Sequence, residues 1–239
     1  MGKTKFRHEW KHEISSSDLM ALRSRLSVIM RPDANGIDGR YKIRSIYFDN
    51  LNDKALREKL DGVSRREKFR LRYYDDDTSF ILLEKKSKVN GLCSKEKVQI
   101  SEEAARILIL GEPVPGAGYE ETGSEAPDEA AGLHPLLAEL NAKLRLQGLR
   151  PRTIVDYTRQ AFVYGPGNVR VTLDYGIRTG ITCTDFLNPE AVMIPAGNAP
   201  AILEVKWDEF LPSFIRDAVQ MKQCRTVAYS KYAACRIYG

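Results

Sequence analysis

The chain has 239 residues, of which 37 are Lys or Arg and 32 are Asp or Glu, so its formal net charge is +5. This length allows a sizeable core in a single domain over residues 1–239, and the basic balance favours an anionic partner. No apolar run approaches bilayer-spanning length and the N-terminus lacks an apolar signal region, which argues against a membrane span or secretion. The four cysteines form no CxxC pair, so neither a zinc site nor a disulfide framework is indicated, and we expect a cytoplasmic location.

Five helices are predicted along the chain. The first follows Ser15, where a serine cap precedes leucines at helical spacing. The others are predicted at 52–60, 101–110, 135–147 and 212–224. Between 111 and 132 the chain holds six acidic residues and no Lys or Arg. We expect this stretch, which is rich in Gly and Pro, to be a solvated, low-complexity insertion.

Strands are predicted by charged residues that recur at every second position, with apolar residues between them. Such alternation puts the charges on one face of a strand. Breaks are indicated at 75–77, at 165–168 and at Asn90-Gly91, a pair typical of hairpins. Because Arg and Lys dominate these positions, we expect a closed or nearly closed sheet with a basic interior, covered outside by helices. The alternating sets are Glu9 and Lys11; Lys68, Arg70 and Arg72; Glu84, Lys86 and Lys88; Lys95 and Lys97; Tyr157 and Arg159; Arg170, Thr172 and Asp174; and Glu204 and Lys206.

Cations at alternate positions of several strands can supply convergent donors to a phosphate chain, whose hydration must be replaced on binding. Three strand carboxylates, Glu9, Glu84 and Glu204, each precede a lysine by two residues. They suit a hard divalent cation, Mg²⁺ or Mn²⁺, that bridges the protein and phosphate oxygens. For any single Glu-x-Lys the alternative is a cross-strand salt bridge that balances charge.

Eight segments follow one another along the chain between residues 8 and 232: HEWKHEI, RSIYFDN, KFRLRYY, LLEKKSK, DYTRQAFV, VRVTLD, AILEVKW and SKY. In this order, and leaving out the acidic insertion, they resemble the polyphosphate polymerase domain of the vacuolar transporter chaperone (VTC) family, which belongs to the triphosphate tunnel metalloenzymes. The resemblance implies an α+β fold in which an eight-stranded antiparallel β tunnel, lined by Arg, Lys and Glu, is flanked by helices.

The resemblance also implies roles for three groups of side chains. Phosphate contacts inside the tunnel would come from Lys11, Arg70, Arg72, Lys86, Arg159, Arg170 and Lys206. Assisting contacts would come from Tyr157, Ser230, Lys231 and one of Lys95 and Lys97. Glu204 resembles the family's metal-binding glutamate, with Glu9 and Glu84 as further candidate ligands. The chain departs from the polymerase motif at Ala228, where the family has a lysine.

The activity that the resemblance implies is transfer of the terminal phosphoryl group of ATP to a polyphosphate chain, with a divalent metal and release of ADP. If water attacks instead, the same site is a triphosphatase or polyphosphatase. A third hypothesis is a non-catalytic module that binds polyphosphate. Nucleic acid is not an expected partner, because the aromatic residues are not interleaved as stacking platforms on a basic face.

Overall fold

The computed structural model describes residues 7–90, 92–116, 133–197, 201–221 and 229–236. Helices and strands alternate irregularly along the chain, and most of the strands are long. In chain order the elements are β1 (His8–Ile14), α1 (Ser16–Ile29), β2 (Arg31–Pro32), β3 (Arg40–Asp49), α2 (Lys54–Leu60), β4 (Arg65–Tyr74), β5 (Asp77–Val89), β6 (Leu92–Ile100), α3 (Glu102–Ile109), α4 (Pro135–Leu146), β7 (Arg150–Tyr164), the 3₁₀ turn η1 (Pro166–Asn168), β8 (Val169–Thr179), β9 (Ile194–Pro195), β10 (Ala201–Trp207), α5 (Ser213–Val219) and α6 (Lys231–Cys235).

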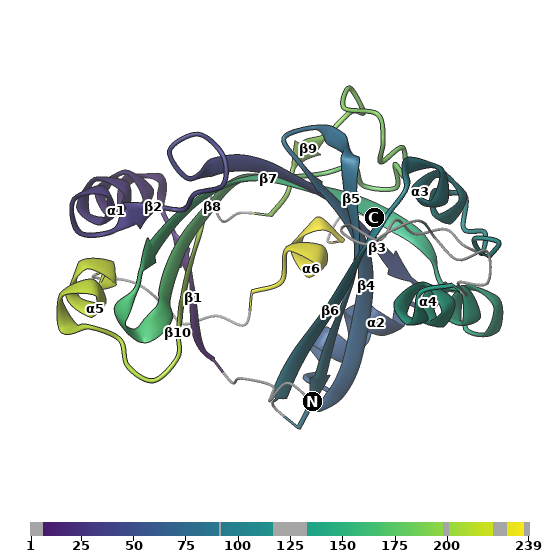
Figure 1. Cartoon of the computed structure of the whole chain (residues 1–239), viewed down its shortest axis with the longest axis horizontal. Coiled ribbons are helices and arrows are strands. Elements are labelled where there is room, and N and C mark those ends of the chain that lie inside the picture. Colours follow the sequence, from purple (N-terminus) through teal and green to yellow (C-terminus); the bar gives the residue numbers. More distant parts are fainter. Residues whose placement is uncertain (1–6, 91, 117–132, 198–200, 222–228, 237–239) are drawn as a thin grey trace, which may run out of the picture.

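The strands form one curled antiparallel sheet in the order β1-β10-β8-β7-β3-β4-β5-β6, with the short strands β2 and β9 paired at its margins. Figure 1 shows the sheet bent into an arch, with the short helix α6 on its concave side. The predicted eight antiparallel strands with flanking helices are therefore confirmed. Within the described residues no ladder joins β1 to β6, so the sheet that was predicted to be closed or nearly closed is a half-barrel.

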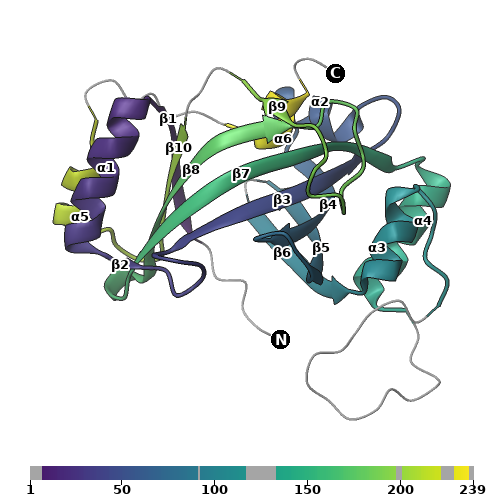
Figure 2. The same cartoon turned by 90° about the horizontal axis from the view of Figure 1, so that it is seen from above.

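Two pairs of helices cover the convex face of the arch at its two ends (Figure 2). Helices α1 and α5 pack on the apolar side of β1, β10 and β8, where Leu203, Val205 and Leu26 are fully buried. Helices α3 and α4 pack on β4 and β5, against Leu71 and Leu83. The apolar half of each alternating strand thus faces the helices, and the charged half faces the concave side.

The helix termini follow the predicted signals. Ser15 caps α1 in a capping box with Asp18, and Ser101 caps α3 by accepting the backbone N–H of Ala104. Helices α2, α3 and α4 lie within two residues of their predicted bounds. The helix predicted at 212–224 is shorter: α5 ends at Val219, and residues 222–224 lie outside the described part of the chain.

The acidic segment 111–132 was predicted to be solvated, but its described part begins in the core. Val114 is buried among the residues beneath α3 and α4. Its backbone N–H and C=O both bind the side-chain amide of Asn141, at 3.0 and 2.8 Å. Residues 117–132 lie outside the described ranges. Among the helices that the structure describes, none has the length and apolar character needed to cross a bilayer.

Candidate functional site

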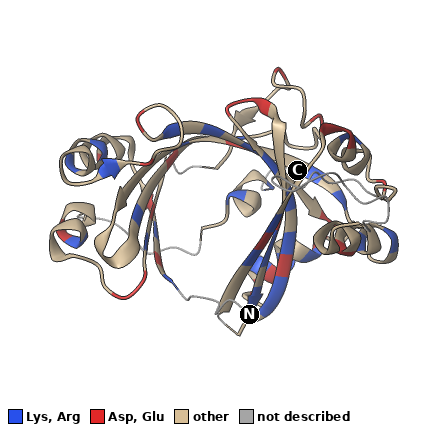
Figure 3. Cartoon of the chain, in the orientation of Figure 1, with Lys and Arg blue, Asp and Glu red and all other residues tan. Residues whose placement is uncertain are grey.

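Lys and Arg recur on strand after strand of the arch (Figure 3). Because the alternate residues of these strands lie in the two helix-covered cores, the charged set must point into the arch. Most of its cations are held by carboxylates of the same face, which divide them into three clusters and one separate arginine.

The first cluster joins the strands β1 and β10, where Glu9 and Glu204 lie side by side with two lysines between them. Lys11 Nζ lies 2.7 Å from Glu9 Oε2 and 3.4 Å from Glu204 Oε2. Lys206 Nζ lies 3.3 Å from Glu9 Oε1 and also contacts Glu204. Burial raises the pKa of Glu204, but Lys206 and Lys11 outweigh it and hold the pKa well below its usual value. The Glu-x-Lys spacing therefore forms salt bridges within each strand as well as between strands.

The second cluster surrounds Asp174 on β8, whose side chain is completely buried. Arg159 binds both carboxylate oxygens, at 2.7 and 2.8 Å, and Lys231 from α6 approaches to 2.6 Å. Burial raises the pKa of Asp174, but Arg159 and Lys231 bring it down to about 2. Lys231 also lies 4.6 Å from the centre of the Tyr157 ring, so that this ring and the acid fix its position.

The third cluster is centred on Glu84 of β5, which contacts Arg70 at 2.6 Å, Arg72 at 3.9 Å and Lys95. Three hydroxyls orient the arginines: Arg70 donates to Tyr47 Oη at 2.9 Å, and Arg72 donates to Tyr157 Oη at 3.2 Å and to Ser45 Oγ at 3.0 Å. Burial raises the pKa of Glu84, but its cationic neighbours lower it to about 2. The guanidinium groups are therefore held in fixed directions.

The remaining predicted residues differ in their surroundings. Arg170 stands apart from the clusters, bound to Asp33 at 2.6 Å and to Tyr41 Oη at 3.0 Å. Ser230 is the N-cap of α6, and its Oγ accepts the backbone N–H of Ala233 at 3.3 Å. Lys86 and Lys97 make no ion pair with a carboxylate among the described residues. Ala228 lies outside the described residues.

Tyr47 and Lys68 belong to the same face, although neither was among the predicted site residues. The Lys68 ammonium lies 5.3 Å from the centre of the Tyr47 ring. Burial raises the pKa of the Tyr47 phenol, but Arg70 and Lys68 lower it to about 7. Burial also lowers the pKa of Lys68, and repulsion from Arg70, Lys86 and Lys11 keeps it near 8 although Tyr47 opposes the shift. Two sequence features could have identified them as site residues: Tyr47 lies in the RSIYFDN segment, and Lys68 alternates with Arg70 and Arg72.

Two of the three predicted carboxylates are placed to hold a divalent cation together. Glu9 and Glu204 converge and offer two hard oxygen ligands, which fits such an ion if phosphate oxygens complete its coordination. Glu84 belongs to a different cluster and does not join them. The described residues hold no group of three His, Cys, Asp or Glu side chains placed to bind a metal by themselves.

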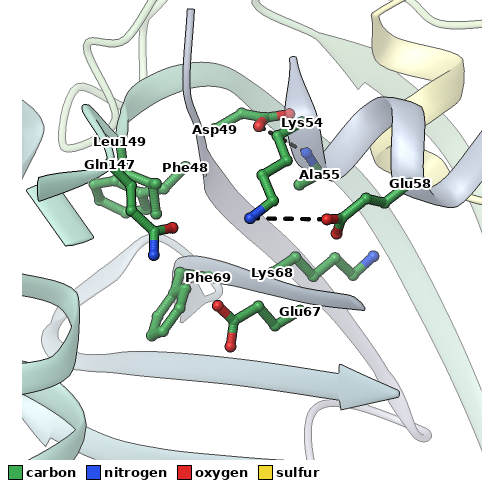
Figure 4. Close-up of a pocket in the computed structure, with 10 residues that line it drawn as sticks. All are labelled: Phe48, Asp49, Lys54, Ala55, Glu58, Glu67, Lys68, Phe69, Gln147 and Leu149. Carbon is green, nitrogen blue, oxygen red and sulfur yellow. Dashed lines mark hydrogen bonds and ion pairs between the residues drawn. The ribbon is translucent and has the colours of Figure 1, made fainter. Parts of the chain in front are cut away.

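A small cavity beside the concave face is shown in Figure 4, between α2, β3 and β4. Its volume is about 30 Å³, room for little more than a water molecule, and its walls include Phe48, Phe69 and Leu149. Of the charged concave residues only Lys68 reaches it. The ionic clusters of the open arch, and not this cavity, therefore form the candidate site.

The family model of the VTC domain matches residues 6–237, nearly the whole chain. A search of curated proteins gave no match. Among solved structures, the chain is similar to the crystal structure of a putative adenylate cyclase from Bacillus halodurans, at 12% identity and a TM-score of 0.48, with 84% of this chain and 80% of that chain covered. The resemblance proposed from the motifs is confirmed by the family model: the chain belongs to the VTC-domain family.

Proposed function

We propose that the protein is a metal-dependent phosphotransferase of the polyphosphate polymerase type, which moves the terminal phosphoryl group of ATP to a polyphosphate chain. The observation that carries this proposal is the convergence of cations from the two ends of the sheet. Lys11 of β1 and Lys86 of β5 lie close enough for Lys11 to lower the pKa of Lys86, after the larger effect of burial. Mutual repulsion of this kind disfavours the empty site and favours a polyanion in it.

The reaction needs no nucleophilic side chain. A terminal phosphate oxygen of the chain attacks the γ-phosphorus of ATP, the bond from that phosphorus to the bridging oxygen breaks, and ADP departs with the oxygen. Arg70 and Arg72, held in fixed directions by Glu84 and two tyrosine hydroxyls, would align the phosphates and stabilise the charge on the transferring group. Arg159, Lys231 and Lys206 would bind the flanking phosphates.

Glu9 and Glu204 would hold the divalent cation. When bound, such an ion neutralises charge on phosphate oxygens and fixes their orientation. Lys11 and Lys206, which contact both carboxylates, would then be free to turn from the glutamates to the phosphates. Glutamine at position 204 would keep an oxygen ligand but lose the negative charge that attracts the cation.

Hydrolysis is the second candidate function, and the open side of the arch favours it. Because β1 and β6 are not paired in the described part of the chain, water can approach the concave face between them. With water as the attacking group, the same residues would make a triphosphatase or a polyphosphatase.

The deciding experiment is ³¹P NMR of the protein incubated with ATP and Mn²⁺, with and without a short polyphosphate primer. Growth of an internal-phosphate signal together with ADP is the expected result. If orthophosphate appears without any internal-phosphate signal, the activity is hydrolysis and not polymerisation. If ATP is unchanged although the protein binds triphosphate tightly, the protein is a non-catalytic binding module.

A pair of variants ties the activity to the site. Glu204→Gln should lower turnover on the order of 100-fold, because a metal ligand is lost while the shape of the side chain is kept. Glu96→Gln is the matched control: Glu96 also lies on a strand, but alternates to the opposite face and contacts Lys85 at 3.8 Å. Equal activity of the two variants would remove Glu204 from the mechanism.

A further inference from the structure

Among the concave side chains, Tyr47 presents a hydroxyl that has a hydrogen-bond donor beside it but no acceptor. Tyr47 of β3 stands directly opposite Arg70 of β4 in the register of the sheet, and Arg70 Nη1 donates to Tyr47 Oη at 2.9 Å. The side chain is buried, and none of the described residues accepts a hydrogen bond from the hydroxyl. Donors around a buried phenol oxygen favour its deprotonated form, because they bond to the negative charge and compensate it.

The ring of Tyr47 also lies among cations. The Lys68 ammonium lies 5.3 Å and the Arg70 guanidinium 5.7 Å from the centre of the ring. The contacts from the helices are uncharged: Tyr232 of α6 stacks on the ring with centroids 5.0 Å apart, and Leu56 of α2 packs in the same cluster. A negative charge on Tyr47 would therefore meet cations and apolar groups, and no acid of the described residues contacts it directly.

Cations outnumber acids in this neighbourhood. Burial raises the pKa of Tyr47, but Arg70, Lys68 and Arg72 outweigh it and bring the pKa to about 7. Each of the two acids is already bound to another group. The charged and titratable groups that face Tyr47 or its direct neighbours are Lys68, Arg70 and Arg72 on β4, Glu84 and Lys86 on β5, Lys11 on β1, Tyr157 on β7, Tyr232 on α6 and Asp49 at the end of β3.

Tyr41 makes a similar contact in different surroundings. Its Oη accepts a hydrogen bond from Arg170 at 3.0 Å, and Asp33 is bound to Arg170 at 2.6 Å. Burial raises the pKa of Tyr41 above its ordinary value, and Asp33 opposes the effect of the nearby arginines. What distinguishes Tyr47 is Lys68, a cation that makes no ion pair with an acid in the described part of the chain.

We propose that Tyr47 is a proton-linked positioning residue, which as a phenolate compensates Arg70 and Lys68 in the empty site and takes up a proton from solvent when a phosphate group binds there. The neutral phenol still accepts the Arg70 hydrogen bond and so keeps the guanidinium in place for the phosphate. Because phenolate and phosphate compete for the same cations, affinity for phosphate is greatest below about pH 7 and falls as the pH rises through that value. The inference rests on the proposed function in taking the concave face as a phosphate site.

The ionisation is tested by near-ultraviolet absorption, in which phenolate differs from phenol. One of the 11 tyrosines should ionise near pH 7 in the free protein, well below an ordinary tyrosine. Tyr47→Phe should remove this step, and Lys68→Gln should move it to higher pH because a cation beside the ring is lost. Tyr41→Phe is the matched control and should keep the step. A wild type without the step, or a step that survives in Tyr47→Phe, would overturn the proposal.

The link to the ligand is tested with tripolyphosphate, which should move the absorption step to higher pH by about one unit or more. Affinity is measured by calorimetry at about pH 6 and about pH 8, at equal ionic strength. Over this range the wild type should lose about five- to tenfold in affinity relative to Tyr47→Phe, since titration of tripolyphosphate itself is common to both proteins.

Two results would overturn the proton link: an absorption step that tripolyphosphate leaves in place, or an equal pH dependence of affinity in wild type and Tyr47→Phe. If the wild type binds no tripolyphosphate at either pH, the proposed function itself fails. The absorption step of the free protein is measured without ligand, so it tests the ionisation of Tyr47 separately and the two failures are distinguished.

Discussion

Asp174 is the residue on which two of the site's cations depend. Its side chain is fully buried, whereas its partners Arg159 and Lys231 keep 16% and 14% of their side chains exposed toward the arch. The carboxylate therefore balances the charge of the two cations from the buried side, and their exposed atoms, which face the arch, are accessible to a ligand. A buried acid in this position holds two cations together in the absence of phosphate.

Removing this acid should destabilise the protein in a pH-dependent way. Asp174→Asn leaves two cations without their carboxylate and should lower the free energy of unfolding at pH 7 by about 3 kcal/mol. Because the pKa of Asp174 in the folded protein is about 2, below the ordinary value of an aspartate, its contribution is complete only above about pH 5. It is lost as the pH falls through 2, so the difference between variant and wild type should narrow over that interval in urea unfolding. Exposed Asp217→Asn is the control, and a constant difference across the range would contradict this account.

The partners of Asp174 show what the sequence could and could not predict at this scale. Alternation correctly put Asp174 on the same face as Arg170. It could not say that Arg159 would be the partner, because the register of β7 against β8 shifts between Asp156 and Thr158. Lys231 reaches the acid from a helix 57 residues later. Side-chain partners across strands depend on register, which no local pattern fixes.

Helix α6 is the element that the sequence did not predict as a helix. It has five residues, too few to be stable alone, so tertiary contacts must hold it. Tyr232 stacks on Tyr47 with ring centroids 5.0 Å apart and donates to Asp49 Oδ2 at 2.8 Å. Arg236 contacts both oxygens of Asp53, at 2.8 and 3.0 Å. The longer helices were predictable because their caps and apolar spacing are local signals.

Loosening α6 should affect both stability and binding. Tyr232→Phe removes the hydrogen bond to Asp49 and should lower the free energy of unfolding by about 2 kcal/mol, since the acceptor is a buried carboxylate. Because α6 carries Lys231, affinity for tripolyphosphate should fall as well. Chemical unfolding and calorimetry measure the two effects. Tyr164→Phe is the control, since Tyr164 contacts Phe214 by its ring alone. Equal losses of stability and affinity in the two variants would contradict a specific role of α6.

At the scale of the whole molecule, the arch is a sheet whose two edges face each other across the site. The alternation of charged and apolar residues predicted that helices cover the outer face, and the motif resemblance predicted eight antiparallel strands. A closed or nearly closed sheet was also predicted, and among the described residues β1 and β6, at the two ends of the strand order, are not paired. Lys11 of β1 and Lys86 of β5, the strand next to the other edge, lie close enough for Lys11 to lower the pKa of Lys86, after the larger effect of burial.

A phosphate chain should draw these edges together. Bound as proposed, tripolyphosphate would contact cations of both arms at once, so it should slow amide hydrogen exchange in β1 (His8–Ile14) and β6 (Leu92–Ile100). The central strands β3 and β7 are already paired on both sides and should change little. Hydrogen exchange followed by mass spectrometry measures the difference, with inorganic phosphate at equal ionic strength as the control that cannot span the arms. Uniform slowing across all strands would mean that the ligand stabilises the fold globally without joining its edges.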